Sequence, residues 1–308
     1  MTNSANHYEL IIIGGGSAGL TAGIYTSRDK LNSLLIEKGL VGGQIGTAEM
    51  VENYPGFPDG IGGFELTDLM QRQATKFGLK TVTAEVTGIE PQKKQIVVKT
   101  SEGNYTAQAV IIASGSERRK LGIPGEEKFS GKGVAYCATC DAPLFRDAHV
   151  AIVGGGDVAI TEALHLAKFA SKVTLIHRRN QLRASAGLQE QALSHPKIEF
   201  IWDTVVEEIE GDNLVRRIKL RQVKTGEKST LEVGGVFVSV GLKPNTDYLK
   251  GVLKLDEGGH IITNEKMETE VPGIFAAGDI RHNSARQAIT AAGDGATAAF
   301  YAEKFLNQ

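Results

Sequence analysis

Cysteine is scarce in this sequence: Cys137 and Cys140 are the only two among 308 residues. So few cysteines exclude a disulfide framework, which needs several pairs. Structural zinc needs four ligands. The chain has neither a second cysteine pair nor two histidines at the spacing His-x3–5-His. We therefore expect no metal site.

Long hydrophobic runs and a strong net charge are also absent. The apolar stretches are broken by glycine and fall far short of the ~20 residues that a membrane span needs. The opening "MTNSANHYELIII" has no basic region before its apolar run, so we expect no secretory signal. A formal net charge of -2 does not favour nucleic acid or an anionic membrane. We expect a cytoplasmic protein with neither partner.

Glycine, in contrast, is abundant and clustered, and the clusters reveal an internal repeat. Residues 11–39 and 151–179 align without a gap. Each reads as an apolar strand, a glycine turn, a helix and a second strand, which is the β-α-β unit with a Gly-x-Gly-x-x-Gly/Ala turn. The turn positions are Gly14, Gly16 and Gly19 in the first copy and Gly154, Gly156 and Ala159 in the second.

These turn positions suit a dinucleotide. The first glycine permits the tight turn, the second lets the backbone approach a pyrophosphate, and the third keeps helix and strand close. The pyrophosphate then meets free N–H groups at the helix N-terminus. One such turn is weak evidence. Two copies in the same context predict two dinucleotide sites in two related domains.

The residue that ends the second strand distinguishes the two sites. In the first copy it is Glu37, and a carboxylate there accepts hydrogen bonds from ribose hydroxyls and repels a 2′-phosphate. In the second copy it is His177, followed by Arg178, Arg179 and Arg183. Arginine binds phosphate in a bidentate manner, so the second site should prefer NADPH over NADH. The alternative is a solvated basic loop.

The Cys-x-x-Cys spacing favours redox chemistry over two incidental thiols. At a helix start, the N-terminal N–H groups favour the thiolate, which is the form that attacks a disulfide. Asp141 follows and could exchange protons or simply be a first-turn charge. A nicotinamide delivers a hydride and cannot efficiently reduce a disulfide alone, whereas a flavin can mediate that transfer. We therefore expect FAD in the first site.

The segments that flank the repeat complete the fold. Residues 80–113 and 197–240 each predict a strand, a hairpin with a turn at "SEGN" or "KTGE", and a closing strand. The last segment predicts a strand, a loop and a C-terminal helix. We expect an α/β fold of two Rossmann-like, three-layer dinucleotide-binding domains. The NADPH domain (118–246) is inserted into the FAD domain (1–117 and 247–308).

Over its whole length the chain resembles the low-molecular-weight, prokaryote-type thioredoxin reductases. "CATCD" matches that family's active-site motif, and "HRRNQLRA" fits its NADPH motif. "VGGQI", "VENYPGFP", "IFAAGDI" and "RQAITAAGDG" match its flavin segments. The resemblance implies a homodimer that reduces thioredoxin. It also implies that Cys140 faces the flavin, that Cys137 exchanges with thioredoxin and that Asp141 is the acid–base group.

The resemblance also implies a set of cofactor contacts, some of which coincide with the glycine turns. For FAD these are Gly14, Gly15, Gly16, Ser17, Ala18, Gly19, Glu37, Lys38, Gly43, Gln44, Asn53, Val86, Ala113, Gly115, Gly278, Asp279, Arg286, Gln287 and Ala288. For NADPH they are Gly154, Gly156, Asp157, Val158, Ala159, His177, Arg178, Arg179 and Arg183.

The sequence departs from the family pattern at two places. Ala142 and Pro143 follow Asp141, where many relatives have glycine, and "ASG" replaces Ala-Thr-Gly. Pro143 could stiffen or shift the helix that begins at the dithiol. The nearest rival is a ferredoxin-fed reductase, which the intact second glycine turn and its arginines disfavour. A non-enzymatic flavin redox sensor and a zinc-stabilised scaffold are more distant alternatives.

Overall fold

The computed structural model describes residues 6–48 and 50–308. The chain forms two compact units: unit 1 is Met1–Glu117 with Lys243–Gln308, and unit 2 is Arg118–Leu242. The sequence predicts that the inserted domain ends at residue 246, whereas unit 2 ends at Leu242. The reason lies at Asn245, whose backbone N–H donates to the Gly115 carbonyl at 3.0 Å and whose Nδ2 donates to the Ser114 carbonyl at 2.8 Å.

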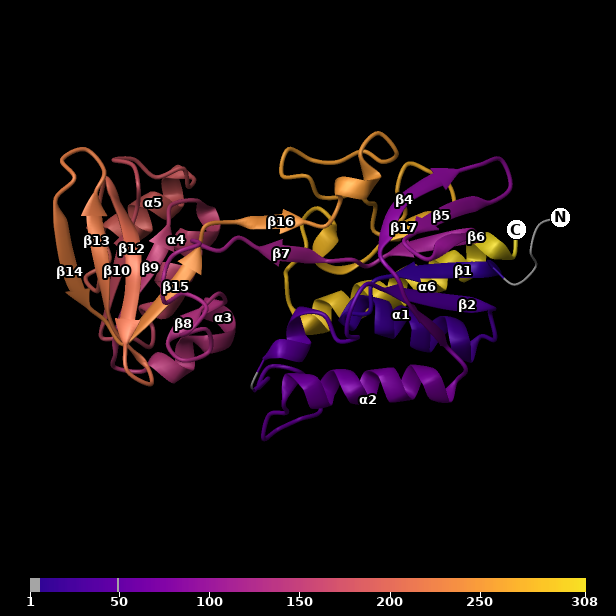
Figure 1. Cartoon of the computed structure of the whole chain (residues 1–308), viewed down its shortest axis with the longest axis horizontal. Helices are drawn as coiled ribbons and strands as arrows, with labels where there is room; N and C mark the ends of the chain where they lie inside the picture. Colours follow the sequence, from indigo (N-terminus) through magenta and orange to yellow (C-terminus); the bar gives the residue numbers. More distant parts are fainter. Residues whose placement is uncertain (1–5, 49) are drawn as a thin grey trace. The chain divides into compact units, whose positions relative to one another are not determined.

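Unit 1 is built on a seven-stranded sheet with the order β3-β2-β1-β6-β5-β4, in which β17 also pairs with β6 (Figure 1). Strands β1, β2, β3, β6 and β17 pair in parallel, and β4-β5-β6 form an antiparallel meander. The predicted hairpin with its "SEGN" turn is confirmed. The strand bounds are β1 His7–Ile13, β2 Ser33–Glu37, β3 Lys80–Thr83, β4 Val86–Pro91, β5 Ile96–Thr100, β6 Gly103–Ile112 and β17 Ile274–Ala276.

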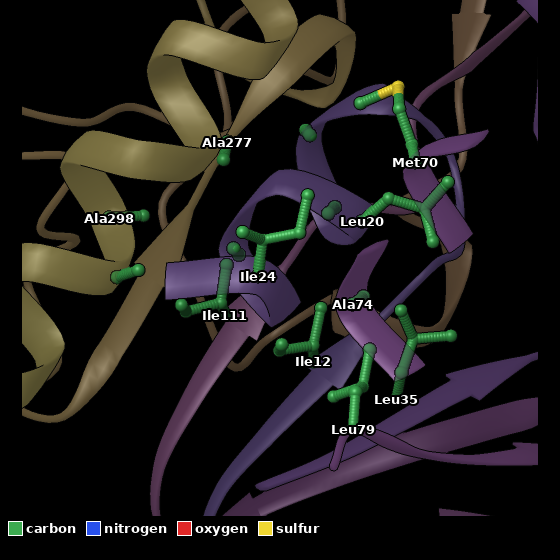
Figure 2. Packing of buried hydrophobic residues seen from close by; sticks show 14 of the residues in the cluster. Ile12, Leu20, Ile24, Leu35, Met70, Ala74, Leu79, Ile111, Ala277 and Ala298 are labelled. Atoms are coloured by element: carbon green, nitrogen blue, oxygen red, sulfur yellow. The ribbon is translucent and has the colours of Figure 1, made fainter. Parts of the chain in front are cut away.

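Both faces of this sheet are buried along β1, β2 and β17, which explains why these strands are nearly continuously apolar. Leu10 and Ile12 of β1 belong to the cluster that packs against the helices, and Ile11 and Ile13 belong to the cluster on the other face. Figure 2 shows Ile12 packed in the helical cluster with Leu20. The helices are α1 (Ser17–Arg28), α2 (Gly63–Lys76) and α6 (Ala288–Leu306), with short turns η2 (Gln44–Thr47), η4 (Asp247–Leu249) and η5 (Gly278–Ile280).

Unit 2 has three layers. Its parallel sheet has the order β11-β10-β9-β15-β8, and an antiparallel sheet β12-β13-β14 covers one face. Helices cover the other face. The strands are β8 Val134–Ala135, β9 His149–Gly154, β10 Lys172–Ile176, β11 Ile198–Ile201, β12 Thr204–Gly211, β13 Val215–Gln222, β14 Lys228–Glu232 and β15 Gly235–Ser239. The helices are α3 Ala138–Asp141, α4 Asp157–Leu166 and α5 Ala186–Leu193, and the turn η3 spans Ala142–Phe145.

The predicted fold class is confirmed, because two three-layer α/β units are present and unit 2 interrupts the sequence of unit 1. The chain passes between the units twice, in β7 (Ser116–Arg118) and β16 (Leu242–Pro244), which pair as a two-stranded sheet. Within the described ranges, no helix has the length and apolarity needed to span a membrane.

Candidate active site

The first glycine turn joins β1 to α1 with no room for side chains. Gly14 has a φ of +104°, and a Cβ there would lie 2.4 Å from the Ala113 carbonyl oxygen. A Cβ on Gly19 would lie 1.8 Å from the Gly14 carbonyl oxygen, which explains why the third position is glycine. Gly16 is the N-cap of α1, and no side chain caps the helix. The first-turn N–H groups of α1 therefore have no side-chain acceptor, as anion binding at a helix N-terminus requires.

We expect Gly19→Ala to prevent assembly of unit 1 and to abolish flavin retention. The added methyl would lie 1.8 Å from the Gly14 carbonyl oxygen, and overpacking typically costs about 1–3 kcal/mol, and more where the neighbour is backbone that cannot move away. Flavin absorbance of the purified protein and its thermal unfolding measure the effect. Gly187→Ala is the control, because a Cβ at Gly187 on helix α5 meets nothing within 4 Å. Full flavin content in Gly19→Ala would contradict this account of the turn.

Glu37 is held beside the glycine turn at the end of β2. Its Oε2 accepts the Gly15 N–H at 2.7 Å and its Oε1 accepts the Gly39 N–H at 3.1 Å. Each carboxylate oxygen can accept more than one hydrogen bond, so both remain able to receive ribose hydroxyls. Gly42 donates its N–H to the Gly15 carbonyl at 2.8 Å. This bond brings the segment that contains Gly43 onto the turn.

Further candidate flavin residues from distant parts of the sequence meet in unit 1. Asn53 Nδ2 donates to Gln287 Oε1 at 3.3 Å. Gln44 Nε2 donates to the carbonyl of Ser116, and Ser116 Oγ donates to the carbonyl of Asp279 at 2.6 Å. The structure therefore joins Gln44 to Asp279 through Ser116, a buried residue that the sequence did not single out.

Four further FAD candidates of unit 1 are placed as follows. Lys38 is exposed and pairs with Glu117 at 3.3 Å. Val86 begins β4, two residues after Ala84, whose N–H donates to the Glu37 carbonyl at 2.9 Å. Arg286 is exposed and has a φ of 57°, a conformation that is uncommon outside glycine and often found at functional sites. Ala288 begins α6, whose N-terminus has no side-chain cap.

The second glycine turn joins β9 to α4 in unit 2. A Cβ on Gly154 would lie 2.5 Å from the Ser239 carbonyl oxygen and 2.6 Å from the Cβ of Ala159. Gly156 is the N-cap of α4 and faces open space, as close approach of a pyrophosphate requires. Asp157 is the first residue of α4, and its Oδ1 accepts the Ser185 N–H at 2.8 Å.

His177 and the arginines occupy the position that Glu37 has in unit 1. His177 is buried, its Nε2 has no hydrogen-bond partner, and a Cβ on Gly155 would lie 2.3 Å from its ring. Burial lowers the pKa of His177, which favours the neutral ring. The side chains of Arg178, Arg179 and Arg183 are exposed, and no carboxylate of the described chain forms an ion pair with them. They are available to an external phosphate.

Cys137 and Cys140 form a disulfide across the start of α3, with their Cα atoms 5.3 Å apart. Cys137 is the N-cap of the helix, and its Sγ accepts the Cys140 N–H at 3.2 Å. This bond would favour a Cys137 thiolate after reduction. Cys137 is buried, whereas Cys140 is exposed. Pro143 does not bend α3, because the helix ends at Asp141 and Pro143 lies in the following 3-10 turn.

Asp141 is half-buried next to the disulfide. Burial raises the pKa of its carboxyl above the ordinary value of 3.8, and the charge of Arg118 partly opposes that rise. A carboxyl with a raised pKa keeps its proton to higher pH than an ordinary aspartate, which suits a group that exchanges protons.

We expect Asp141→Asn to gain thermal stability relative to the unaltered protein as the pH rises through the acidic range. The folded chain holds the Asp141 proton more tightly than the unfolded chain does. Stability therefore falls with pH from about 3.8 up to the raised pKa of the folded state. Thermal unfolding of the two oxidised proteins between about pH 3.5 and 8 measures the difference in stability between Asp141→Asn and the unaltered protein. Asp212→Asn, at an exposed site, is measured in parallel as the control. A stability advantage of Asp141→Asn that shrinks as the pH rises would contradict the raised pKa of Asp141.

Sequence reasoning missed several residues that hold these sites. Gly155 could have been found, because it aligns with Gly15. Glu162 of α4 accepts the Ala138 N–H at 3.4 Å, and Ser284 Oγ donates to Asp279 Oδ1 at 3.0 Å. Neither contact has a sequence signal, because each depends on how the elements pack.

Two dinucleotide-type glycine turns and a Cys-x-x-Cys disulfide in one chain are the features of a disulfide oxidoreductase. The model of the family described as pyridine nucleotide-disulphide oxidoreductase matches residues 8–295. A thioredoxin reductase of Peptoclostridium acidaminophilum is 46% identical over 98% of this chain and 98% of its own. A thioredoxin reductase of Bacillus subtilis (strain 168) is 45% identical over 98% of this chain and 95% of its own.

Solved structures of thioredoxin reductases also resemble this chain. The crystal structure of thioredoxin reductase from Streptococcus pyogenes MGAS5005 is 44% identical, covers 99% of each chain and has a TM-score of 0.93. The thioredoxin reductase from Giardia duodenalis is 37% identical, covers 98% of this chain and 100% of its own, and also has a TM-score of 0.93. The chain belongs to the thioredoxin reductase family, and it is an oxidoreductase.

Proposed function

We propose that this chain carries two electrons from NADPH, through FAD, to the Cys137–Cys140 disulfide and then to the disulfide of thioredoxin. The observation that carries the proposal is the disulfide across α3 in a chain that holds two glycine turns of different chemistry. Unit 1 offers a carboxylate at the strand end and unit 2 offers three arginines. These features support FAD in unit 1 and NADPH in unit 2.

The residues of the chain fit both cofactors. In unit 1, the close-packed Gly14 and Gly19 leave an uncapped helix start for a pyrophosphate, and Glu37 would orient the ribose. In unit 2, Gly156 faces open space and the unpaired Nε2 of buried His177 offers a hydrogen-bonding atom beside the turn. When bound, the flavin supplies the conversion between hydride transfer and thiol chemistry.

The remaining steps take place at Cys137, Cys140 and Asp141, in α3 and at its N-cap. Two electrons and two protons convert the disulfide into two thiols. The Cys137 thiolate, favoured by the Cys140 N–H, attacks one sulfur of the thioredoxin disulfide and releases the other as a thiolate. Cys140 then attacks the mixed disulfide, which restores the Cys137–Cys140 bond and releases reduced thioredoxin. Asp141 would supply and recover the protons. Because Cys137 is buried, the first attack requires the α3 segment to become accessible.

An anaerobic titration with NADPH tests this route. We expect a flavin spectrum that is fully reduced only after about two electrons per chain beyond those that FAD itself takes, since the disulfide accepts two. Bleaching without the extra uptake would separate the disulfide from the flavin and overturn the proposal. Reduction by dithionite but not by NADPH would instead favour a ferredoxin-fed reductase.

Sustained turnover separates an enzyme from a redox sensor. We expect steady NADPH consumption only when a thioredoxin is added, in a protein that acts as a homodimer in the cytoplasm. A single reduction event without turnover on any thioredoxin would favour the sensor. Sedimentation analysis tests the dimer directly.

A further inference from the structure

A partly buried ion pair lies beside the turn that carries Asp279. The guanidinium of Arg281 forms two bonds with the carboxylate of Asp294: Nε donates to Oδ2 at 2.6 Å and Nη2 donates to Oδ1 at 2.8 Å. The side chains are only 19% and 10% exposed. Two parallel bonds of this kind fix the relative position of the partners as well as their charge.

The same carboxylate also holds the other end of the turn. Asp294 Oδ2 accepts the N–H of Gly278 at 3.1 Å. Gly278 has a φ of +78° and begins η5, and Arg281 follows the last residue of η5. Asp294 therefore clamps both ends of the turn that carries Asp279.

Close backbone packing ties this clamp to the first glycine turn. A Cβ on Gly295 would lie 2.1 Å from the Ala18 carbonyl oxygen, and a Cβ on Gly278 would lie 3.1 Å from the Ala18 Cβ. Helix α6, which carries Asp294, thus lies directly against the start of α1. The Asp279 turn is positioned relative to the first glycine turn, which is the candidate pyrophosphate site.

We propose that Arg281 and Asp294 are a positioning pair that holds the Asp279 turn in its flavin-binding conformation before FAD arrives. This inference rests on the proposed function, because it takes FAD as the ligand of unit 1. If the pair is lost, the turn spends less time in the binding conformation, and the apparent Kd for FAD rises by the inverse of the remaining fraction. The pair acts through the turn and need not touch the flavin.

The test compares FAD binding with the stability of the FAD-free protein. We expect Asp294→Asn to raise the Kd for FAD by about 10- to 100-fold, since hydrogen bonds to a charged group are lost. Flavin fluorescence during rebinding to the stripped full-length chain measures the Kd. Hydrogen exchange of the stripped protein should be faster in residues 278–281. Glu90→Gln, which breaks an exposed ion pair with Lys99 in the same unit, should change neither quantity.

A double variant separates positioning from general stability. Arg281→Met with Asp294→Leu removes both charges, and apolar replacement of a whole buried pair often leaves stability unchanged or higher. We expect its FAD-free form to unfold near the temperature of the unaltered protein, while its Kd for FAD stays at least 10-fold raised. The Gly278 N–H has then lost its carboxylate acceptor. Should Asp294→Asn fail to fold, this variant alone decides the question.

Each outcome bears on a different claim. A Kd that is unchanged in both variants, or that recovers together with stability in the double variant, overturns the positioning role and leaves the proposed function intact. Failure of FAD to bind the unaltered stripped protein overturns the proposed function and this inference with it.

Discussion

Cys140→Ser should abolish thioredoxin reduction while the protein still binds flavin and still accepts electrons from NADPH. The single thiol of Cys137 cannot form the Cys137–Cys140 disulfide, through which the proposed route passes electrons from the flavin to thioredoxin. Turnover with thioredoxin should therefore fall on the order of 10³-fold or more. An anaerobic NADPH titration should lose the two-electron uptake that the disulfide provides, and the flavin should reduce at the first equivalent.

Cys137→Ser is the matched variant, because it removes the other sulfur and leaves Cys140. Both variants should lose turnover. Only Cys140→Ser should trap a mixed disulfide with thioredoxin, since it keeps the Cys137 thiolate that the Cys140 backbone N–H favours. A trapped adduct in Cys137→Ser and none in Cys140→Ser would reverse the two roles. Persistent turnover in either variant would remove the pair from the pathway.

Removing the charges of Arg178 and Arg179 together should abolish most of the preference for NADPH. Both arginines are exposed and neither forms an ion pair with a carboxylate of the described chain, so both can bind a 2′-phosphate. Charge-assisted bonds contribute about 1.5–3 kcal/mol each. In Arg178→Gln/Arg179→Gln, we expect kcat/KM for NADPH to fall about 10²- to 10⁴-fold, while kcat/KM for NADH changes little.

Steady-state kinetics with each nucleotide and saturating thioredoxin measure the shift. Arg217→Gln is the control within the same unit, because Arg217 is already engaged with Glu210 at 2.6 Å. Equal losses with NADPH and NADH would mean that the arginines support the fold or the common part of the nucleotide. An unaltered protein that uses both nucleotides equally well would refute the assignment of the 2′-phosphate site.

The fold and the glycine turns could be predicted because their causes are local. Gly14 and Gly19 approach backbone within one β-α unit, and the internal repeat shows that the pattern is not accidental. The alternating burial of Ile11 and Ile12 likewise follows from a strand covered on both faces. The disulfide follows from the spacing of Cys137 and Cys140.

The supporting contacts could not be predicted because they join distant segments. Ser116 meets Asp279 only after β17 has paired with β6, and Asp294 meets Gly278 only where α6 packs against α1. The sequence shows each residue but not its partner. The end of unit 2 at Leu242 has a similar origin, since the long-range bonds of Asn245 to residues 114–115 decide it.

The interrupted sequence of unit 1 has a consequence for how the protein is made. A ribosome delivers residues 118–242 before β17, η5 and α6, and domains fold as units during synthesis. Unit 2 has all of its strands at that point, while the first part of unit 1 still lacks a strand of its sheet and the α6 cover over α1. The Asp279 turn is held in place only after α6 supplies Asp294, which bonds to Gly278 and Arg281. Under the proposed function, flavin is loaded only when translation is almost finished, and a nascent chain stalled before α6 should carry a folded unit 2 and no flavin.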